Sequence, residues 1–403
     1  MPSGNAATIE RDMRTTFSVA APDDVSLSVR PLDQSEGERR LRQVHRAIAE
    51  LRRGAPVLVL TAEGGYLVAA AELSGAATLA RIGTLAAQPA QLLLAPTRAA
   101  AVLQRPAPGG AAVPAVAFRL PPGTTPALLR AFADPTAEPA ALRPETAGLP
   151  PEIPAAVAIR LAKLARLLPA VLAAPVAEPD DWRAFAARHD LIAVPGADVL
   201  GYPDTVAATL TRVGEARVPT EESRETRIIA FRPADGGTEH LAMVVGDPWS
   251  AAEPPLVRLH SECFTGDLLG SLRCDCGPQL RGALARMAEE GAGVLLYLSQ
   301  EGRGIGLVNK LRAYQLQDEG ADTLDANTRL GYGADERNFL IAAAMLRELG
   351  IDTVRVLTNN PDKVAALAAC GIRVAARVPH RFPANEHNDR YLQTKAERFG
   401  HLF

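Results

Sequence analysis

Strand-like and helical segments alternate through the second half of the chain, and this alternation limits the possible folds more than any other feature. Apolar runs predict strands at 240–246, 254–262 and 292–299, and the last of these is apolar enough to be buried. Segments with a helical apolar period lie at 278–291 and 307–320, and each ends on a glycine. Strands that alternate with helices in this way predict an α/β fold, here without a clear Rossmann glycine fingerprint.

The same reading extends to both sides of this region. Toward the C-terminus we expect a helix at 340–350, a strand at 352–360, a helix at 361–371 and a last strand at 372–379, with an irregular stretch at 321–339. In the first half we expect helices at 37–54, 126–134 and 154–172, and strands at 55–60, 65–73 and 91–96. The whole chain is therefore expected to be α/β.

The length of the chain indicates two domains. A single core rarely keeps growing beyond about 300 residues, and this chain has 403. A polar stretch near 205–220 suggests the boundary. We expect a polar tail at 1–37, a first domain at 38–205, a linker at 206–220 and a second domain at 221–403.

Charge and hydropathy exclude two classes of partner. The formal net charge is −3, so no global basic field is available for binding nucleic acid. No apolar stretch approaches the roughly 18 residues that a membrane span needs. The first residues include Glu10 and Asp12 and lack the apolar run of a signal peptide, so we expect a cytoplasmic protein.

Three of the four cysteines, Cys263, Cys274 and Cys276, form a C-x10-C-x-C pattern. In an extended segment Cys274 and Cys276 would point to the same side, so both thiolates could reach one ion. Three thiolates fit a zinc site with an open coordination position, which is typical of catalytic zinc. Two alternatives remain open: a closed structural site with His260 as fourth ligand, or buried cysteines acting as small apolar residues. We interpret Cys370, in an apolar helical stretch, as a core residue.

Two turns between a strand and a helix resemble phosphate-binding turns. In "QEGRGIG", Gly302, Gly304 and Gly306 would let backbone N–H groups approach an anion, and Arg303 could pair with phosphate. In "LTNNPDK" (357–363), Asn360 is a predicted N-cap, Pro361 the first helical residue, and Lys363 a cation in the first turn. Taken alone, the glycine run is better interpreted as a plain tight turn. The two turns together suggest a polyphosphate ligand, although capping alone would explain the second.

A cluster of charged residues in "GADERNF" (333–339) is predicted to start a helix. Acidic Asp335 and Glu336 would there interact favourably with the helix dipole, which leaves Arg337 unexplained. With Tyr314, from the helix predicted at 307–320, Asp335 offers the carboxylate and phenol that proton transfer needs.

Four segments together resemble the GTP cyclohydrolase II family: "RLHSECFTGDLLGSLRCDCGPQL", "QEGRGIGLVNKLRAYQLQDEG", "DANTRLGYGADERNF" and "LTNNPDK". The resemblance runs from about residue 212 to 403. It implies an enzyme that opens the imidazole ring of GTP, releases formate and pyrophosphate, and starts riboflavin synthesis. It also implies one Zn²⁺ per subunit for the ring chemistry and Mg²⁺ bound with the GTP phosphates.

The resemblance assigns roles to individual residues. The implied zinc ligands are Cys263, Cys274 and Cys276. The implied GTP-binding residues are Arg258, Leu259, His260, Ser261, Glu262, Gln279, Glu301, Gly302, Arg303, Thr323, Thr358 and Lys363. The implied catalytic residues are Asp335 as proton acceptor, Tyr314 in support, and Arg337 at the α-phosphate. A guanidinium has a pKa above about 12 and is a poor nucleophile, so charge stabilisation is an equally good role for Arg337.

The first half resembles 3,4-dihydroxy-2-butanone 4-phosphate synthase, but it lacks that family's metal-binding groups. The segments that carry this resemblance are "AIAELRRGAPVLVL", "VAAAELSGAATLARIGT", "LLLAPTRAAAVL", "TTPALLRAFADPTAEPAALRP" and "FAARHDLIAVPGADVLGY". The acidic loop of the family corresponds to "LTAEGGYLV" (60–68), where Glu63 is the only acid, and its histidine segment corresponds to "LPPEIPAAVAI" (149–159), which has no histidine. Since a divalent cation needs oxygen or imidazole ligands, we predict an inactive synthase-like domain. Both families are usually homodimers, so the resemblance implies a homodimer.

Three other functions remain open at this point. The chain could be a relative that acts on another nucleotide or in pyrimidine breakdown. It could be a bifunctional enzyme with an active first half. It could also be a zinc-binding scaffold without catalysis.

Overall fold

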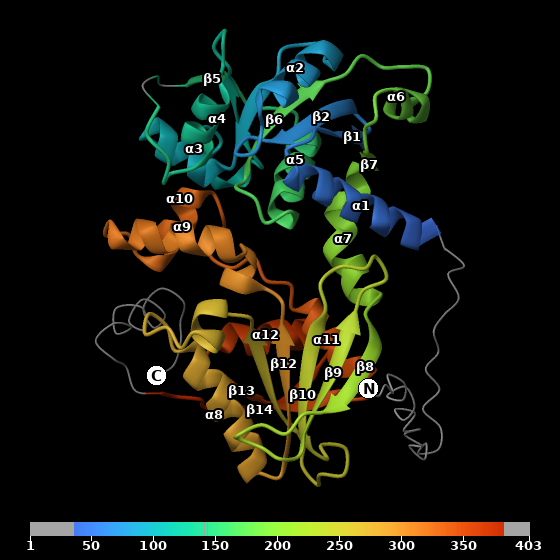
Figure 1. Ribbon diagram of the computed structural model, residues 1–403, viewed down its shortest axis with the longest axis vertical. Coiled ribbons are helices and arrows are strands. Elements are labelled where there is room, and N and C mark those ends of the chain that lie inside the picture. The colour runs from blue at the N-terminus through green and yellow to red at the C-terminus, as the bar shows by residue number, and fades with distance from the viewer. Residues whose placement is uncertain (1–35, 141, 143, 383–403) are drawn as a thin grey trace, which may run out of the picture. The chain divides into compact units, whose positions relative to one another are not determined.

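The structure, a computed structural model, describes residues 36–140, 142 and 144–382 (Figure 1). The predicted tail at 1–37 lies almost wholly outside the described residues. The described residues form two seven-stranded sheets with helices packed on them, so the expectation of a two-domain α/β fold is confirmed.

The first sheet has the strand order β5-β4-β3-β6-β2-β1-β7. Its strands are β1 (Val57–Thr61), β2 (Gly64–Ala70), β3 (Gln91–Leu94), β4 (Val116–Arg119), β5 (Glu145–Gly148), β6 (Ala170–Pro175) and β7 (Ala193–Pro195). The accompanying helices are α1 (Glu36–Arg52), α2 (Ala76–Leu85), α3 (Pro96–Leu103), α4 (Pro126–Ala133), α5 (Glu152–Leu164), α6 (Trp182–Arg188) and α7 (Gly196–Ala208). All neighbouring pairs are antiparallel except β1 with β7.

The second sheet has the order β14-β13-β11-β12-β10-β9-β8. Its strands are β8 (Thr211–Arg217), β9 (Thr226–Arg232), β10 (His240–Gly246), β11 (Leu256–Ser261), β12 (Ala292–Leu298), β13 (Thr353–Leu357) and β14 (Arg373–Val378). Its helices are α8 (Cys276–Glu289), α9 (Leu307–Asp318), α10 (Thr323–Leu330), α11 (Leu340–Glu348) and α12 (Pro361–Ala369). Strands β14, β13, β11 and β12 are parallel, whereas β12, β10, β9 and β8 pair antiparallel.

Apolar side chains on the central strands of the second sheet are buried on both faces. On β11, Leu256 belongs to a cluster with Leu284 and Met287 of α8, whereas Val257 belongs to a second cluster with Leu346 of α11. Because side chains alternate across a strand, these two helices cover opposite faces. This double cover explains why the central strands have continuous apolar sequences.

A third apolar cluster contains residues from both halves of the chain. From the first half it includes Leu92, Leu94, Phe118 and Phe132, and from the second half Ile305, Leu316, Leu330 and Tyr332. All eight are at most 3% exposed. We refer to the cluster as the shared core, because helices α9 and α10 of the second half pack into it with strands of the first half.

Three expectations about local structure were wrong. The predicted helix at 154–172 ends at Leu164, and its last part is strand β6, since short apolar runs fit a buried helix and a buried strand equally well. Much of the expected linker at 206–220 is β8, an edge strand whose exposure permits its polar sequence. The stretch at 321–339 contains α10, which Asp322 caps and Gly331 ends with a φ of 92°.

Within the described residues, no helix has the length and hydropathy that crossing a membrane requires.

Candidate active site

A cavity of about 510 Å³ lies beyond the carboxyl ends of the parallel strands of the second sheet. Cys263 follows β11, the turn at Glu301–Gly304 follows β12, and Thr358 follows β13. Open α/β sheets characteristically bind ligands at this edge, because the loops after parallel strands meet there.

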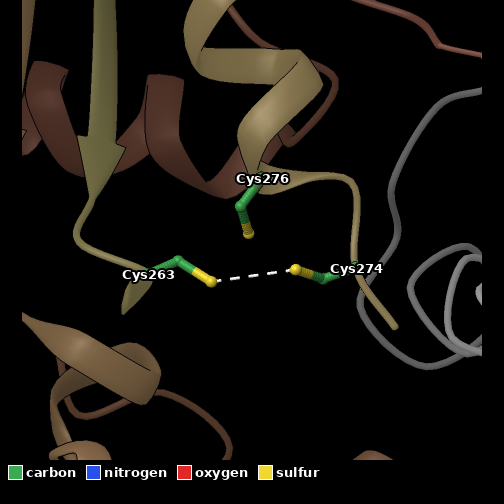
Figure 2. Close-up of side chains that lie close together, drawn as sticks. All are labelled: Cys263, Cys274 and Cys276. Atoms are coloured by element: carbon green, nitrogen blue, oxygen red, sulfur yellow. Dashed lines mark hydrogen bonds between the residues drawn. The ribbon is translucent and has the colours of Figure 1, made fainter. Parts of the chain in front are cut away.

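The three clustered cysteines meet at one side of this cavity (Figure 2). Their sulfur atoms all lie within 4.8 Å of one another, and Cys263 Sγ is 3.7 Å from Cys274 Sγ. Cys276 is the first residue of α8, so the expected extended segment with Cys274 and Cys276 side by side was wrong. The chain instead turns between the two residues and still directs both thiols inward.

Gly266 makes this convergence possible. A Cβ at this position would lie 2.7 Å from Cys274 Sγ, 2.9 Å from Cys276 Cβ and 3.1 Å from Cys263 Sγ. Real Cβ atoms almost never approach other atoms so closely. The donor set and the absence of a side chain beneath it fit a thiolate-bound metal ion, and the cysteines are the only such group among the described residues.

Lys310 of α9 donates hydrogen bonds to Cys263 Sγ at 3.0 Å, Thr265 Oγ1 at 3.0 Å and Glu301 Oε1 at 2.9 Å. Hydrogen bonds from the Cys274 and Cys276 thiols, helped by the Lys310 charge, hold the pKa of Cys263 far below its usual range. Lys310 was not among the residues predicted from the sequence. A signal was present, because Lys310 precedes Tyr314 by four residues and so shares its face of the helix.

His260 does not join the three thiols. Its Nε2 lies 3.0 and 3.1 Å from the two carboxylate oxygens of Asp267. Asp267 also accepts hydrogen bonds from Tyr297 Oη at 3.0 Å and from the Cys263 backbone N–H at 2.9 Å. Burial lowers the pKa of His260. The closed three-cysteine and histidine site is therefore not formed, and His260 belongs to a network that orients the Cys263 backbone.

Two buried cations line the cavity, one from β11 and one from the first turn of α12. Arg258 is buried and donates from Nη1 to the Leu357 carbonyl at 3.0 Å and from Nη2 to Gln279 Oε1. Burial lowers the pKa of Arg258 to about 10. Lys363 donates to the Leu259 carbonyl at 2.8 Å. The capping expected in the second turn is confirmed, since Asn360 accepts from the backbone N–H of residue 362.

Asp335 and Arg337 form an ion pair that also lines the cavity. Arg337 Nε donates to both carboxylate oxygens, at 2.8 and 3.0 Å. Burial alone would raise the pKa of Asp335, but the hydrogen bond and charge of Arg337 outweigh it and lower the pKa. The expectation that these residues start a helix was wrong, because α11 begins only at Leu340.

The cavity brings the residues of the predicted site together with one exception. Leu259 has its side chain in the sheet core, at 1% exposure, and presents only its backbone to Lys363. The others line the cavity: Arg258, His260, Ser261, Glu262, Cys263, Cys274, Cys276, Gln279, Glu301, Gly302, Arg303, Tyr314, Thr323, Asp335, Arg337, Thr358 and Lys363. Their individual roles remain predictions.

In the first half, the segment at 60–68, where the resemblance places the acidic metal-binding loop, forms a tight hairpin. Strands β1 and β2 pair from Val57↔Val68 to Thr61↔Gly64, which leaves Ala62 and Glu63 as a two-residue hairpin turn. Glu63 is exposed. No group of potential metal ligands is found there among the described residues.

Comparisons with known proteins agree with the four quoted segments. The sequence profile of GTP cyclohydrolase II matches residues 211–379. A GTP cyclohydrolase-2 of Pseudomonas paraeruginosa is 55% identical over 190 residues, which cover 47% of this chain and 92% of that protein. The riboflavin biosynthesis protein RibBA of Bacillus velezensis is 49% identical over 218 residues, 54% of each chain.

A further relative extends over both halves of the chain. A GTP cyclohydrolase-2 of Azospirillum brasilense is 51% identical over 392 residues, which cover 96% of this chain and 98% of the relative. The similarity thus includes the first half, where the hairpin turn lies, as well as the half that carries the thiol cluster. On these grounds the chain belongs to the GTP cyclohydrolase II family.

Proposed function

We propose that this protein is a zinc-dependent GTP cyclohydrolase II that carries out the first step of riboflavin biosynthesis. It hydrolyses GTP to 2,5-diamino-6-(5-phosphoribosylamino)pyrimidin-4(3H)-one and releases formate and pyrophosphate. The observation that carries the proposal is that one cavity contains the three thiols, the Asp335–Arg337 pair and both turns with cationic side chains.

The thiol cluster would hold the zinc ion through Cys263, Cys274 and Cys276. When bound, zinc supplies a Lewis acid that lowers the pKa of a water molecule near C8 of the guanine. Lys310 and the Asp267 carboxylate support this role, because each contacts Cys263 and fixes its position.

The phosphates would bind between the two strand-to-helix turns. Gly302 and Arg303 both have left-handed backbone angles, with φ of 62° and 61°. Arg303 takes this conformation without being a glycine, and such backbone strain is common at ligand-binding turns. Arg303 and Lys363 contribute positive charge at the two turns, and Mg²⁺ would accompany the phosphates.

Asp335 is suited to accept a proton. Its carboxylate is ionised near neutral pH and Arg337 fixes its orientation, although the lowered pKa also makes it a weaker base than a free aspartate. Arg337 can also stabilise negative charge that develops on the α-phosphate, which its fixed position favours over a nucleophilic role. Tyr314 lies on the same cavity wall as Lys310 and would assist from there.

The remaining parts of the proposal concern the first half and the assembly. We propose that residues 38–205 form a synthase-like domain without its original activity, since a two-residue turn stands where the resemblance places the acidic loop. The catalytic domain would comprise residues 221–403. The protein would act in the cytoplasm as a homodimer, which light scattering coupled to size exclusion can test.

Product analysis from GTP tests the proposal directly. The purified protein with GTP, Zn²⁺ and Mg²⁺ should release formate, pyrophosphate and a diaminopyrimidine nucleotide in equal amounts. Pyrophosphate without formate would overturn ring opening. Turnover of another nucleotide in preference to GTP would favour the related substrate class, and tightly bound zinc with no nucleotide turnover would favour a scaffold.

A further inference from the structure

The loop that carries Asp335 and Arg337 is held in part from the first half of the chain. Glu336, between these two residues, accepts a hydrogen bond at Oε1 from Lys163 Nζ at 2.6 Å and another from the Gly333 N–H at 2.8 Å. Lys163 belongs to the last turn of α5. Lys163 of the first half therefore binds Glu336, the residue between Asp335 and Arg337.

Glu336 also joins this loop to the turn at Glu301–Gly304, which we call the phosphate turn because the proposed function places GTP phosphates there. Its backbone N–H donates to the Arg303 carbonyl at 3.0 Å. Gly304 lies so close that a Cβ there would be 2.7 Å from the Glu336 carbonyl oxygen. A displacement of Glu336 would consequently disturb both the Asp335–Arg337 pair and the turn that contains Arg303.

The loop borders two cavities. Asp335 and Arg337 line the cavity of the candidate active site and also a second cavity of about 410 Å³. Residues of α5, α7 and the second half line this second cavity. The position of a segment that borders two cavities depends more on individual hydrogen bonds and ion pairs than on apolar packing. The Lys163 and Glu336 side chains are only 24% and 14% exposed, so solvent screens this ion pair less than it screens a surface pair.

Helix α9, which also lines the cavity, contacts the first half in a similar way. Arg312 of α9 pairs with Glu72 at 2.7 Å and with Asp134 at 2.9 Å, and both acids are buried. Asn309 donates to the Arg166 carbonyl at 2.9 Å. Helix α9 also carries Lys310 and Tyr314, so two walls of the cavity take their positions from residues before position 205.

From these contacts we propose that Lys163 is a positioning residue for the cyclohydrolase reaction. It acts through Glu336 and contacts no reacting atom. By holding Glu336 it fixes the positions of Asp335 and Arg337 relative to the phosphate turn. This inference rests on the proposed function. The first half thus contributes to the reaction of the second half by positioning its residues.

The test compares three variants in the full-length, zinc-loaded protein. Lys163→Met removes the charge and keeps the side-chain length. Lys163→Arg restores a cation at the same place. Arg160→Met is the matched control, because Arg160 lies one turn earlier on α5, lines the same second cavity, and makes no ion pair with the described residues.

We expect Lys163→Met to lower kcat about tenfold and to change KM for GTP less than about twofold, because a small misplacement of catalytic groups acts on the chemical step. Lys163→Arg should recover most of the loss, and Arg160→Met should match the unaltered protein. A purely structural role would instead lower the melting temperature and the zinc content and leave kcat per zinc unchanged. That result, or equal loss in Lys163→Met and Arg160→Met, would overturn the proposal.

Hydrogen exchange provides a readout that does not depend on the reaction. Peptides that cover residues 333–338 should exchange faster in Lys163→Met than in Arg160→Met, because the loop loses its anchor. Unchanged exchange would refute the inference even if GTP turnover were absent. Failure of the unaltered protein to release formate would refute the proposed function alone, so the two failures can be told apart.

Discussion

Two strands in this molecule, one in each sheet, lead into connecting segments of very different length. After β11 the chain makes a long excursion from Cys263 to Cys276, and this excursion holds three thiols around one point. After β1 the chain turns back within two residues, and the carboxylate of Glu63 points to solvent. A site for a cation needs several donors that converge on one point, and among the described residues only the first of the two segments provides them.

The comparison shows that a sheet can have a complete core whether or not its strand ends carry a site. The first sheet keeps a complete core, with Val57, Val59 and Val68 fully or almost fully buried beside the shortened turn. Strands and their packing depend on apolar side chains that point inward, whereas a site depends on a few polar residues in the loops. A sheet core can therefore form without a site in the loops beside it.

The strongest test of this contrast removes one thiol. Cys274→Ser should lower formate release from GTP by about a thousandfold or more, because a catalytic metal and its ligands act as a unit. Zinc content by mass spectrometry should fall with it. Cys370→Ser, on a cysteine outside the cluster, should retain both zinc and activity. Full activity of Cys274→Ser would remove the thiol cluster from the mechanism.

A second test fills the space beneath the thiols. Gly266→Ala should weaken zinc binding by about 10- to 100-fold, in the range of other changes next to a metal site, since the new methyl group would press against Cys274 and Cys276. Gly83→Ala is the control, because a Cβ there meets nothing within 4 Å. Competition with a chromophoric chelator measures the affinity. Equal affinities in the two variants would show that the thiols tolerate a shift.

A third test concerns His240, a buried histidine that contacts the chain just before the phosphate turn. His240 is 5% exposed and accepts the Ser299 N–H at 3.0 Å, and burial lowers its pKa to about 4. Because the unfolded chain binds the proton first, His240 costs stability as the pH falls from about 6.5 to about 4.

His240→Asn can keep the bond to Ser299 through its side-chain oxygen but cannot titrate. The stability lost between pH 7 and pH 5 should therefore be smaller in this variant, by about 1 kcal/mol per pH unit below 6.5. Urea unfolding at both pH values gives the measurement. His189→Asn, a change in the first half at a partly exposed position, serves as control. An unaltered pH dependence in His240→Asn would contradict the assignment.

The smallest effect is expected at the turn of the first half. Glu63→Ala should change neither zinc content nor formate release, since an exposed carboxylate on a two-residue turn holds no ion. Ribulose 5-phosphate should not be consumed by the unaltered protein or by this variant. Consumption that depends on Glu63 would reverse the comparison and make the enzyme bifunctional.

The sequence was most informative where a residue's surroundings are local. Buried central strands such as β10 and β12 and capped helices such as α12 could be located within a few residues, because their apolar runs and the Asn360–Pro361 pair act over short distances. Strand β8 could not, because an exposed edge strand needs no apolar side chains.

The site shows the same division. The cysteines and the turn at Gly302 could be named in advance, whereas the Lys163–Glu336 pair could not, since its partners are 173 positions apart. Leu259 was misplaced for a related reason. Its backbone borders the site, but the alternation of β11 directs its side chain into the core.

The shared core has a consequence for how the molecule comes apart. Ile305, Leu316, Leu330 and Tyr332 are shielded from water by side chains from the first half, so neither half can open without exposing the other. Heat or denaturant should therefore melt the two sheets in one cooperative step instead of two. A chain started after β7 would present that apolar surface to solvent and tend to aggregate, which gives selection a reason to retain the first half.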